Sequence, residues 1–236
     1  MSLRSSILTT ITISSLLISG SSYAFMDWLF GSSITLDSET MNGLKYEDLS
    51  GSKNKLDPSV FNLGLKAYSC ATKRGYQTKP VFTIIDYSKP SSEPRMFIID
   101  LAHKKVKYQE LVAHGKNSGD LVPKHFSNSA NSLESSIGLY KTAFTYYGKN
   151  GYSLRLQGLE AGYNTNAMSR AVVIHGADYV NEDLVRKYGE IGRSWGCPAV
   201  SKDMLKPTIN SIKGGTLVFA YYPDRSWLRE SSFLHC

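Results

Sequence analysis

The chain has 236 residues, of which 42% are hydrophobic and 20% are charged, with a formal net charge of +7. This length suits one domain, or one domain with a small appendage, and the composition excludes global disorder. The 15 tyrosines and 19 glycines, with many short apolar runs, favour a β-rich domain. The positive charge is compatible with nucleic acid, anionic lipid or an acidic wall polymer as a partner, and also with a merely solvated surface.

Residues 1–24 carry the pattern of a cleavable secretory signal. Arg4 is their only charged residue, an uncharged apolar stretch follows from Ile7 to Ile18, and Ser22 and Ala24 are small residues at a cleavage position. The apolar stretch is shorter than the ~20 residues that a membrane span needs. The sequence therefore predicts an exported protein of the periplasm or cell envelope, and export argues against nucleic acid as its partner.

A linker and then a helix are predicted next. Residues 25–56 are polar and dotted with glycine and serine, which is typical of a linker with at most one short helical piece. Asp57 suits a helix N-cap, Pro58 suits the first turn, and apolar side chains recur at helical spacing until Gly75. We expect a helix at about 57–75 and one folded domain from residue 57 to residue 236.

The middle of the chain predicts antiparallel strands. Apolar runs at 81–87, 95–101 and 104–115 are separated by turn residues and indicate a meander. A polar loop of about twenty residues follows, and a loop of that length is usually functional or covers a site. Residues 137–147 and 152–159 flank a tight Asn-Gly turn and indicate a hairpin.

The last third of the chain mixes strands and helices. Residues 170–176 read as a short buried strand, and 181–189 as one or two helical turns. A helix is expected from Ser201 to about Lys213, kinked or broken at Pro207, and a closing strand at 216–222. The sum is a mainly β domain with an N-terminal helix and a C-terminal helix.

An odd number of cysteines in an exported chain leaves at least one unpaired. Cys197 lies in a Gly-Pro turn, whereas Cys70 and Cys236 lie in unremarkable contexts, so we favour a Cys70–Cys236 disulfide with Cys197 free. A packing role for a reduced Cys70 is the alternative. No metal site is expected, because the chain lacks the close Cys or His pairs of zinc sites.

Cys197 has the surroundings that a catalytic thiolate needs. Gly196 allows a substrate to approach closely, Pro198 stiffens the other side, and the helix expected downstream directs its positive end toward the sulfur. Backbone N–H groups from Trp195 to Cys197 are candidates for an oxyanion hole, and Arg193 adds positive charge.

His175 is the best candidate for the general base, because it ends a buried strand and is followed by Gly176. A core histidine satisfied by a backbone carbonyl is the competing interpretation. His103 and His114 lie near other strand ends, and His125 lies in the polar loop, so their claims are weaker.

Ser194 is a rival nucleophile, since Gly-Arg-Ser-Trp-Gly matches the Gly-x-Ser-x-Gly pattern. That elbow requires a strand, the serine and a helix, with the acid and histidine following in the chain. Only His235 follows, so Cys197 is the preferred nucleophile.

Several stretches in one order resemble the YkuD-type L,D-transpeptidases. "VAHGKNSG", "YYGKNGYSLRLQGLE", "VVIHGADYV" and "GRSWGCPAV" cover about residues 80–222 and are similar to the diverged murein L,D-transpeptidase branch of that family. The resemblance implies a YkuD-like β-sandwich catalytic domain that acts on peptidoglycan stem peptides through a cysteine, without a cofactor.

Position by position, the resemblance makes Cys197 the nucleophile and His175 the general base. It implies that the backbone carbonyl of Gly176 orients the histidine ring. It also implies that Gly196 and Cys197 belong to the turn that forms the oxyanion hole.

The resemblance also implies substrate contacts, and two positions depart from the family pattern. The stretch "SSIGLY" is similar to a strand that walls the cleft. The substrate-binding residues expected are Gly138, Tyr140, Arg193 and Ser194. Trp195 stands where the family has histidine, and Ala199 stands where it has arginine. Arg193, before the cysteine, is the candidate to replace that charge.

The implied reaction is acyl transfer in two steps from a tetrapeptide stem to an amine of a second stem or of a wall-anchored protein. Water as the acceptor would instead make the enzyme an L,D-carboxypeptidase or a cross-link-cleaving hydrolase. A wall-binding module without activity is the alternative of another class, with Trp195 as its evidence. A carbapenem is the expected inhibitor.

Overall fold

The computed structural model describes residues 43–76 and 79–236, so the predicted signal peptide and the first part of the predicted linker lie outside it. The strands are β1 (Ser50–Gly51), β2 (Val81–Asp86), β3 (Met96–Asp100), β4 (Lys105–Glu110), β5 (Gly138–Gly148), β6 (Gly151–Gly158), β7 (Val173–Gly176), β8 (Ala199–Val200) and β9 (Leu217–Tyr221). The helices are α3 (Pro58–Lys73), α4 (Glu182–Tyr188), α5 (Lys202–Ile212) and α6 (Arg225–Glu230), with short 3-10 turns η1 (Tyr46–Asp48) and η2 (Thr165–Ala167).

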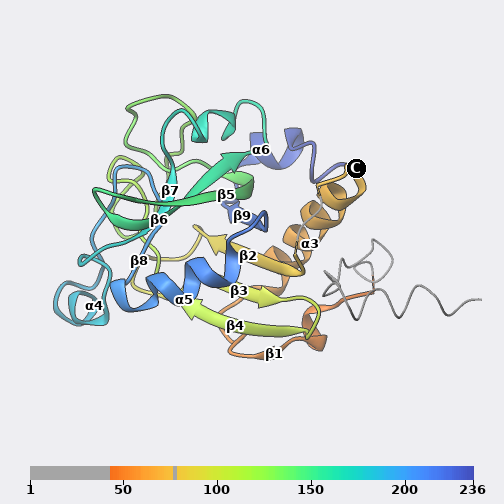
Figure 1. Ribbon diagram of the computed structural model, residues 1–236, viewed down its shortest axis with the longest axis horizontal. Helices are drawn as coiled ribbons and strands as arrows, with labels where there is room; N and C mark the ends of the chain where they lie inside the picture. The colour runs from red at the N-terminus through yellow and green to blue at the C-terminus, as the bar shows by residue number, and fades with distance from the viewer. Residues whose placement is uncertain (1–42, 77–78) are drawn as a thin grey trace, which may run out of the picture. The chain divides into compact units, whose positions relative to one another are not determined.

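The strands of the described residues form one mixed sheet in the order β1-β4-β3-β2-β9-β5-β6-β7-β8 (Figure 1). The predicted meander β2-β3-β4 and the predicted hairpin β5-β6 are both antiparallel. α3 begins after an Asp57 cap and α5 after a Ser201 cap, and α5 continues through Pro207 without a break. The predicted mainly β class, with its N-terminal and C-terminal helices, is confirmed.

β9 lies between the meander β2-β3-β4 and the hairpin β5-β6 in the sheet, and it is buried on both faces. It pairs in parallel with β2 and antiparallel with β5. Leu217 and Phe219 pack in one cluster with Trp227 of α6, and Val218 packs in a second cluster with Ile209 of α5. Burying each such side chain contributes roughly 1.5–3 kcal/mol, so this strand is a centre of the domain's stability.

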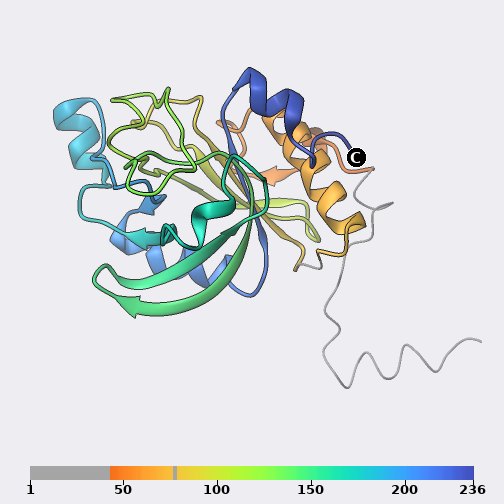
Figure 2. The ribbon, with the colours of Figure 1, turned by 90° about the horizontal axis from the view of Figure 1, so that it is seen from above.

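The segment that follows β4 meets β8, at the far end of the strand order, which produces the sandwich-like arrangement. Ala113, just after β4, forms a bridge with Ala199 of β8, and Gly115 forms one with Ser194. The second cluster accordingly contains side chains from β3 and from β6 and β7. Figure 2 shows the long curved β5–β6 hairpin that permits this closure.

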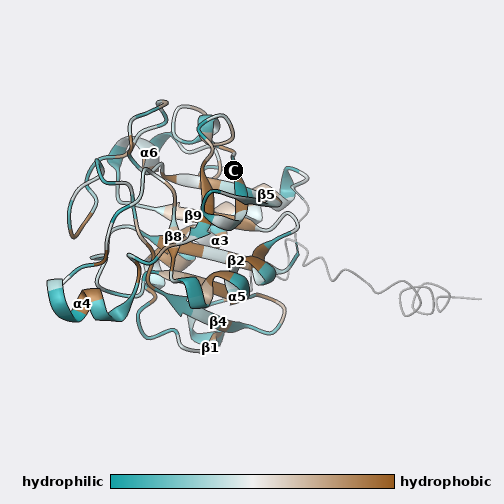
Figure 3. Ribbon diagram, turned by 60° about the vertical axis from the view of Figure 1, so that its left-hand side comes forward, coloured by the Kyte–Doolittle hydropathy of each residue, from teal (hydrophilic) through white to brown (hydrophobic). Residues whose placement is uncertain are grey.

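The apolar strands lie inside and α4 lies outside. In Figure 3 the ribbon near β2, β8 and β9 is brown, whereas α4 is mostly teal. α4 carries no buried residue. Among the helices of the described residues, none combines the length and the apolar character that a membrane crossing requires.

The described part of the predicted linker packs as part of the domain. Leu44, Leu49 and Leu56 are buried in the cluster under α3, and β1 pairs with β4. These leucines are spaced too widely to show a strand or helix period, which explains why the sequence pattern reads as a linker.

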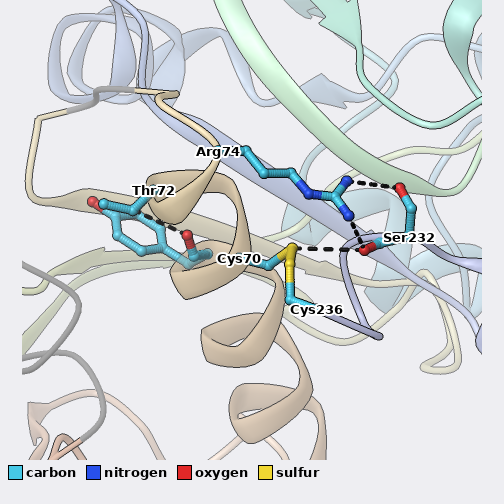
Figure 4. The surroundings of a disulfide bond; sticks show 6 residues. Cys70, Thr72, Arg74, Ser232 and Cys236 are labelled. Carbon is cyan, nitrogen blue, oxygen red and sulfur yellow. Dashed lines mark hydrogen bonds between the residues drawn. A yellow bond between two sulfur atoms is a disulfide. The ribbon is translucent and has the colours of Figure 1, made fainter.

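A disulfide joins α3 to the C-terminal end of the chain. Cys70 and Cys236 are bonded, with Cα atoms 5.7 Å apart, and Cys197 is free, as predicted. Arg74 donates hydrogen bonds to the hydroxyl and the carbonyl of Ser232 beside the disulfide (Figure 4). α6 lies next to α3 in both Figure 1 and Figure 2, so the bond fastens the tail over the core.

Replacing both bonded cysteines, as Cys70→Ser with Cys236→Ser, is expected to lower the free energy of unfolding by about 2–5 kcal/mol, because the bond closes a loop with a sequence separation of 166. Guanidinium unfolding followed by circular dichroism measures the change. Wild-type protein treated with reductant serves as the control and should show a similar loss. An unchanged unfolding midpoint in both samples would contradict this stabilising role.

Candidate active site

Strand pairing brings Cys197 and His175 to the same cavity. His175 of β7 pairs with Ala199 of β8, and Cys197 precedes that pair by two residues. Both side chains line a cavity of about 910 Å³. Two residues that the sequence places far apart in the chain are thus neighbours at one edge of the sheet.

The ring of His175 is oriented by the backbone carbonyl of the next residue, Gly176. Nδ1 lies 3.1 Å from the carbonyl oxygen of Gly176, and because a carbonyl can only accept, Nδ1 carries the proton and Nε2 is free to take one. Burial is the main influence on the pKa of His175 and lowers it, against a smaller rise from the Gly176 hydrogen bond. The imidazole is therefore neutral at neutral pH, which is the form of a general base.

Cys197 carries a free, partly exposed thiol. Its Sγ donates to the carbonyl oxygen of Ala171 across 3.7 Å. Burial raises the pKa of the thiol, while the backbone N–H of Val173 and the charges of Arg170 and Arg155 lower it. Burial dominates, so the resting thiol is protonated and needs a base to become a thiolate.

Ser194 organises the turn that carries Cys197. Its buried hydroxyl donates to the carbonyl oxygen of Cys197 at 2.6 Å and accepts the N–H of Gly196 at 3.0 Å. Both bonds are local, so the Ser194 hydroxyl braces the turn and is not free as a rival nucleophile. Ser194 also lines the cavity, and its contact with substrate stays a prediction. Gly196 has a φ of +117°, and a Cβ there would lie 2.7 Å from the carbonyl oxygen of Glu134.

The hydrogen bond between Gly196 and Ser194 changes which N–H groups are available to form the oxyanion hole. The N–H of Gly196 is used by Ser194, so Gly196 shapes the turn and is not the free donor. Among the hydrogen bonds of residues 43–76 and 79–236, none uses the N–H of Trp195 or of Cys197. Both residues line the cavity, so these two N–H groups are the donors available to an oxyanion.

Arg193 lines the cavity but does not supply the free charge that was expected. Its guanidinium pairs with Asp120 and lies 3.9 Å from Glu190. Its charge is thereby balanced, and Arg193 is not among the groups that shift the pKa of the Cys197 thiol. The ion pair explains the difference, because Asp120 belongs to a distant loop that the sequence does not place beside Arg193.

Two other arginines, missed at the sequence level, provide positive charge to the thiol. Arg170 lines the cavity and begins the segment that leads to β7. Arg155 of β6 lies on the same sheet face as Ser153, which pairs with His175, and its guanidinium stands 5.6 Å over the ring of Tyr146. Nothing in the apolar run at 170–176 or in the hairpin pattern signals this role, because it arises from strand pairing.

Gly138 and Tyr140 are not among the residues that line this cavity. Tyr140 is buried and donates its hydroxyl to the carbonyl oxygen of Ser136 at 2.9 Å, while Gly138 packs against Glu160 and Asn164. Tyr140 lines a second, small pocket together with Gly196 and Pro198, next to the turn of Cys197. That Gly138 and Tyr140 bind substrate stays a prediction.

The long polar loop borders the cavity, as its length suggested. Its residues Ala130, Asn131 and Leu133 form part of the lining. Asn131 and Leu133 both have positive φ values, of 59° and 60°. The loop is fastened to the catalytic turn, because the hydroxyl of Ser135 donates to the carbonyl oxygen of Gly196 at 3.2 Å.

His114 supports the turn and is not placed as a base. Its Nδ1 accepts from Arg95 at 2.7 Å, its Nε2 lies 3.1 Å from the carbonyl oxygen of Gly119, and its backbone carbonyl accepts the N–H of Ser194. Burial, followed by the charge of Arg95, lowers the pKa of His114 to about 4. His103 is exposed and pairs with Asp100.

Within the described residues no cluster of three or more His, Cys, Asp or Glu side chains is arranged to hold a metal ion.

Comparison with known proteins gives one strong match and several distant ones. The sequence profile described as the L,D-transpeptidase catalytic domain matches residues 52–221. No curated protein matches the sequence significantly.

Among solved structures, an L,D-transpeptidase in complex with imipenem is 14% identical, with 61% of this chain and 61% of that chain covered and a TM-score of 0.37. An L,D-transpeptidase from Mycobacterium smegmatis is 13% identical over 61% of this chain and 59% of that chain, with a TM-score of 0.36. One from Stackebrandtia nassauensis is 13% identical over 68% and 66%, with a TM-score of 0.35. This chain thus spans about three fifths of the length of the first two, and the profile match carries the assignment.

Arg155→Met is expected to raise the pKa of the Cys197 thiol further, because the substitution removes a charge that favours the thiolate. The rate of thiol alkylation by iodoacetamide as a function of pH reports that pKa, and its midpoint should move to higher pH. Arg229→Met, on the exposed face of α6, is the matched control and should leave the midpoint in place. A midpoint that is unchanged in Arg155→Met would show that this charge does not act on the thiol.

Proposed function

Because the chain belongs to the L,D-transpeptidase catalytic domain family, we propose that it is an exported enzyme that forms a thioester between Cys197 and a peptidoglycan tetrapeptide stem and transfers the acyl group to an amine. The observation that carries this proposal is the free thiol of Cys197 on the same cavity as His175, whose Nδ1 is held by the carbonyl of Gly176. Export rests on the signal pattern of residues 1–24 alone.

In the first step His175 Nε2 takes the proton of the Cys197 thiol, and Sγ attacks the carbonyl carbon of the third, L-centred residue of the stem. The N–H groups of Trp195 and Cys197 receive the negative charge of the tetrahedral oxyanion. The bond to the terminal D-alanine then breaks, and the imidazolium of His175 returns its proton to the leaving amine. A thioester on Cys197 remains.

In the second step an acceptor amine attacks the thioester. His175 removes a proton from the amine, the new amide forms, and the proton passes to the departing thiolate. The acceptor is an amine of a second stem or of a wall-anchored protein. Water in the same place gives an L,D-carboxypeptidase or a cross-link-cleaving hydrolase.

A non-catalytic wall-binding module is less well supported. Its evidence is Trp195, which replaces the histidine of the family pattern. The side chain of Trp195 is 75% exposed, with Lys116 Nζ 6.0 Å from its ring, so it does not fill the site beside Cys197. The replacement therefore leaves the thiol accessible.

Incubation with a carbapenem is expected to add one drug molecule to Cys197, because the thiolate opens the β-lactam as it would attack a stem carbonyl. Mass spectrometry of the intact protein detects the adduct, and Cys197→Ala should show none. With a tetrapeptide muropeptide, dimers indicate transpeptidation and tripeptides indicate hydrolysis. No adduct together with no muropeptide product would contradict both enzyme functions and leave the binding module.

His175→Ala is expected to lower muropeptide turnover by roughly 10²–10⁴-fold, because no other cavity-lining histidine can accept the thiol proton. Steady-state turnover measures the loss, and an unchanged circular dichroism spectrum shows that the fold persists. His103→Ala, at an exposed position, is the control and should retain activity. Wild-type turnover in His175→Ala would exclude it as the base.

A further inference from the structure

The guanidinium of Arg170 carries a charge that no carboxylate balances. Its Nη atoms donate only to neutral oxygens, namely the carbonyls of Ser127 and Glu134 and the hydroxyls of Ser132 and Ser136. Among the ion pairs of the described residues, none includes Arg170. These bonds fix the side chain in place without neutralising it.

The other cations of the cavity differ from Arg170. Arg193 is paired with Asp120, and Lys202 lies 2.6 Å from Asp178. The remaining lysine of the lining, Lys149, lies on the exposed turn between β5 and β6, where water and salt screen its charge. Arg170 is thus the partly buried, unbalanced cation of this wall.

Arg170 is also close to the nucleophile. A Cβ placed on Gly196 would lie 3.5 Å from Nη2 of Arg170, so the guanidinium lies beside the turn that carries Cys197. The next residue, Ala171, accepts the hydrogen bond of the Cys197 thiol. The charge therefore lies on the wall of the cavity that Cys197 also lines.

The position where the resemblance expects arginine cannot serve in this chain. Ala199 is fully buried, paired with His175 on one side and bridged to Ala113 on the other. A long charged side chain at that position would have to enter the packed sheet, at a large desolvation cost. A positive charge near Cys197 must come from another element, and Arg170 is placed to supply it.

The proposed substrate offers a matching anion. A tetrapeptide stem ends in a D-amino acid whose carboxylate is free and lies one residue beyond the attacked carbonyl. A stem extended by another residue, or joined at that end, carries no carboxylate at this distance. A fixed cation in a partly buried wall favours such an anion more strongly than a surface lysine does.

We propose that Arg170 is a specificity-determining residue, which recognises the free carboxylate of the leaving D-amino acid and so selects stems that end at their fourth residue. This inference rests on the proposed function of the Cys197 site. Arg170, in the segment before β7, thus makes the contact with the charged group of the substrate that Ala199 cannot make.

The test compares kcat/KM for two synthetic donors, a tetrapeptide stem with a free terminal carboxylate and the same stem with a terminal carboxamide. Wild-type protein is expected to prefer the free carboxylate by about 10–100-fold, the range for a hydrogen bond or contact to a charged group. Arg170→Gln should bring this ratio close to one, and Arg170→Lys should retain most of it. Arg186→Gln is the matched control, because Arg186 is exposed on α4, pairs with Asp183 and does not line the cavity, and it should keep the wild-type ratio.

Each outcome separates the inference from the function on which it rests. The ratio compares two substrates in one protein preparation, so a partly folded variant does not distort it. A wild-type ratio near one, or an equal loss for both donors in Arg170→Gln, overturns the carboxylate role while transpeptidation stands. No product from either donor, together with no carbapenem adduct on Cys197, overturns the proposed function and this inference with it.

Discussion

The pairing of β7 with β8 is the constraint on which the rest of the site depends. β8 has only two residues and would not persist alone. It is held on one side by His175 and Gly176 and on the other by the bridge from Ala113. This double attachment fixes the turn before β8, and with it Cys197, at a set distance from the histidine that it needs.

Burial acts on both reacting side chains in the same sense, since it favours the neutral form of each. It raises the pKa of the Cys197 thiol and lowers the pKa of His175. A resting pair of neutral groups is therefore expected, in which thiolate and imidazolium appear together when the proton moves. The charges of Arg170 and Arg155 favour that thiolate, so they reduce the cost of charge separation in a partly buried site.

Local sequence patterns predicted the parts of the fold that depend on local chemistry. The Asp57 cap, the meander, the β5–β6 hairpin and the strand that ends at His175 all follow from periodicity and turn residues. β8 and α6 were missed because two residues and six residues show no usable period. The place of β9 between β2 and β5 is a long-range pairing, which no local pattern specifies.

The two central residues of the candidate site were predictable for a similar reason, and their charged neighbours were not. The Gly-Cys-Pro turn and the histidine at a strand end are local features, so Cys197 and His175 were found from the sequence. The partners of Arg193 and Arg170 come from the loop that precedes β5, and only the folded chain reveals which arginine is neutralised.

The two departures from the family pattern have different physical consequences. Trp195 leaves its ring in solvent and offers its backbone N–H to the cavity, so that position can change side chain without losing the oxyanion donor. Ala199 is fully buried in an apolar cluster with Leu111 and Val180, so a cation at that position would have to enter the core without a partner. The closure that places Cys197 beside His175 is thus the same feature that buries position 199, and in our proposal the substrate-side charge comes from Arg170 instead.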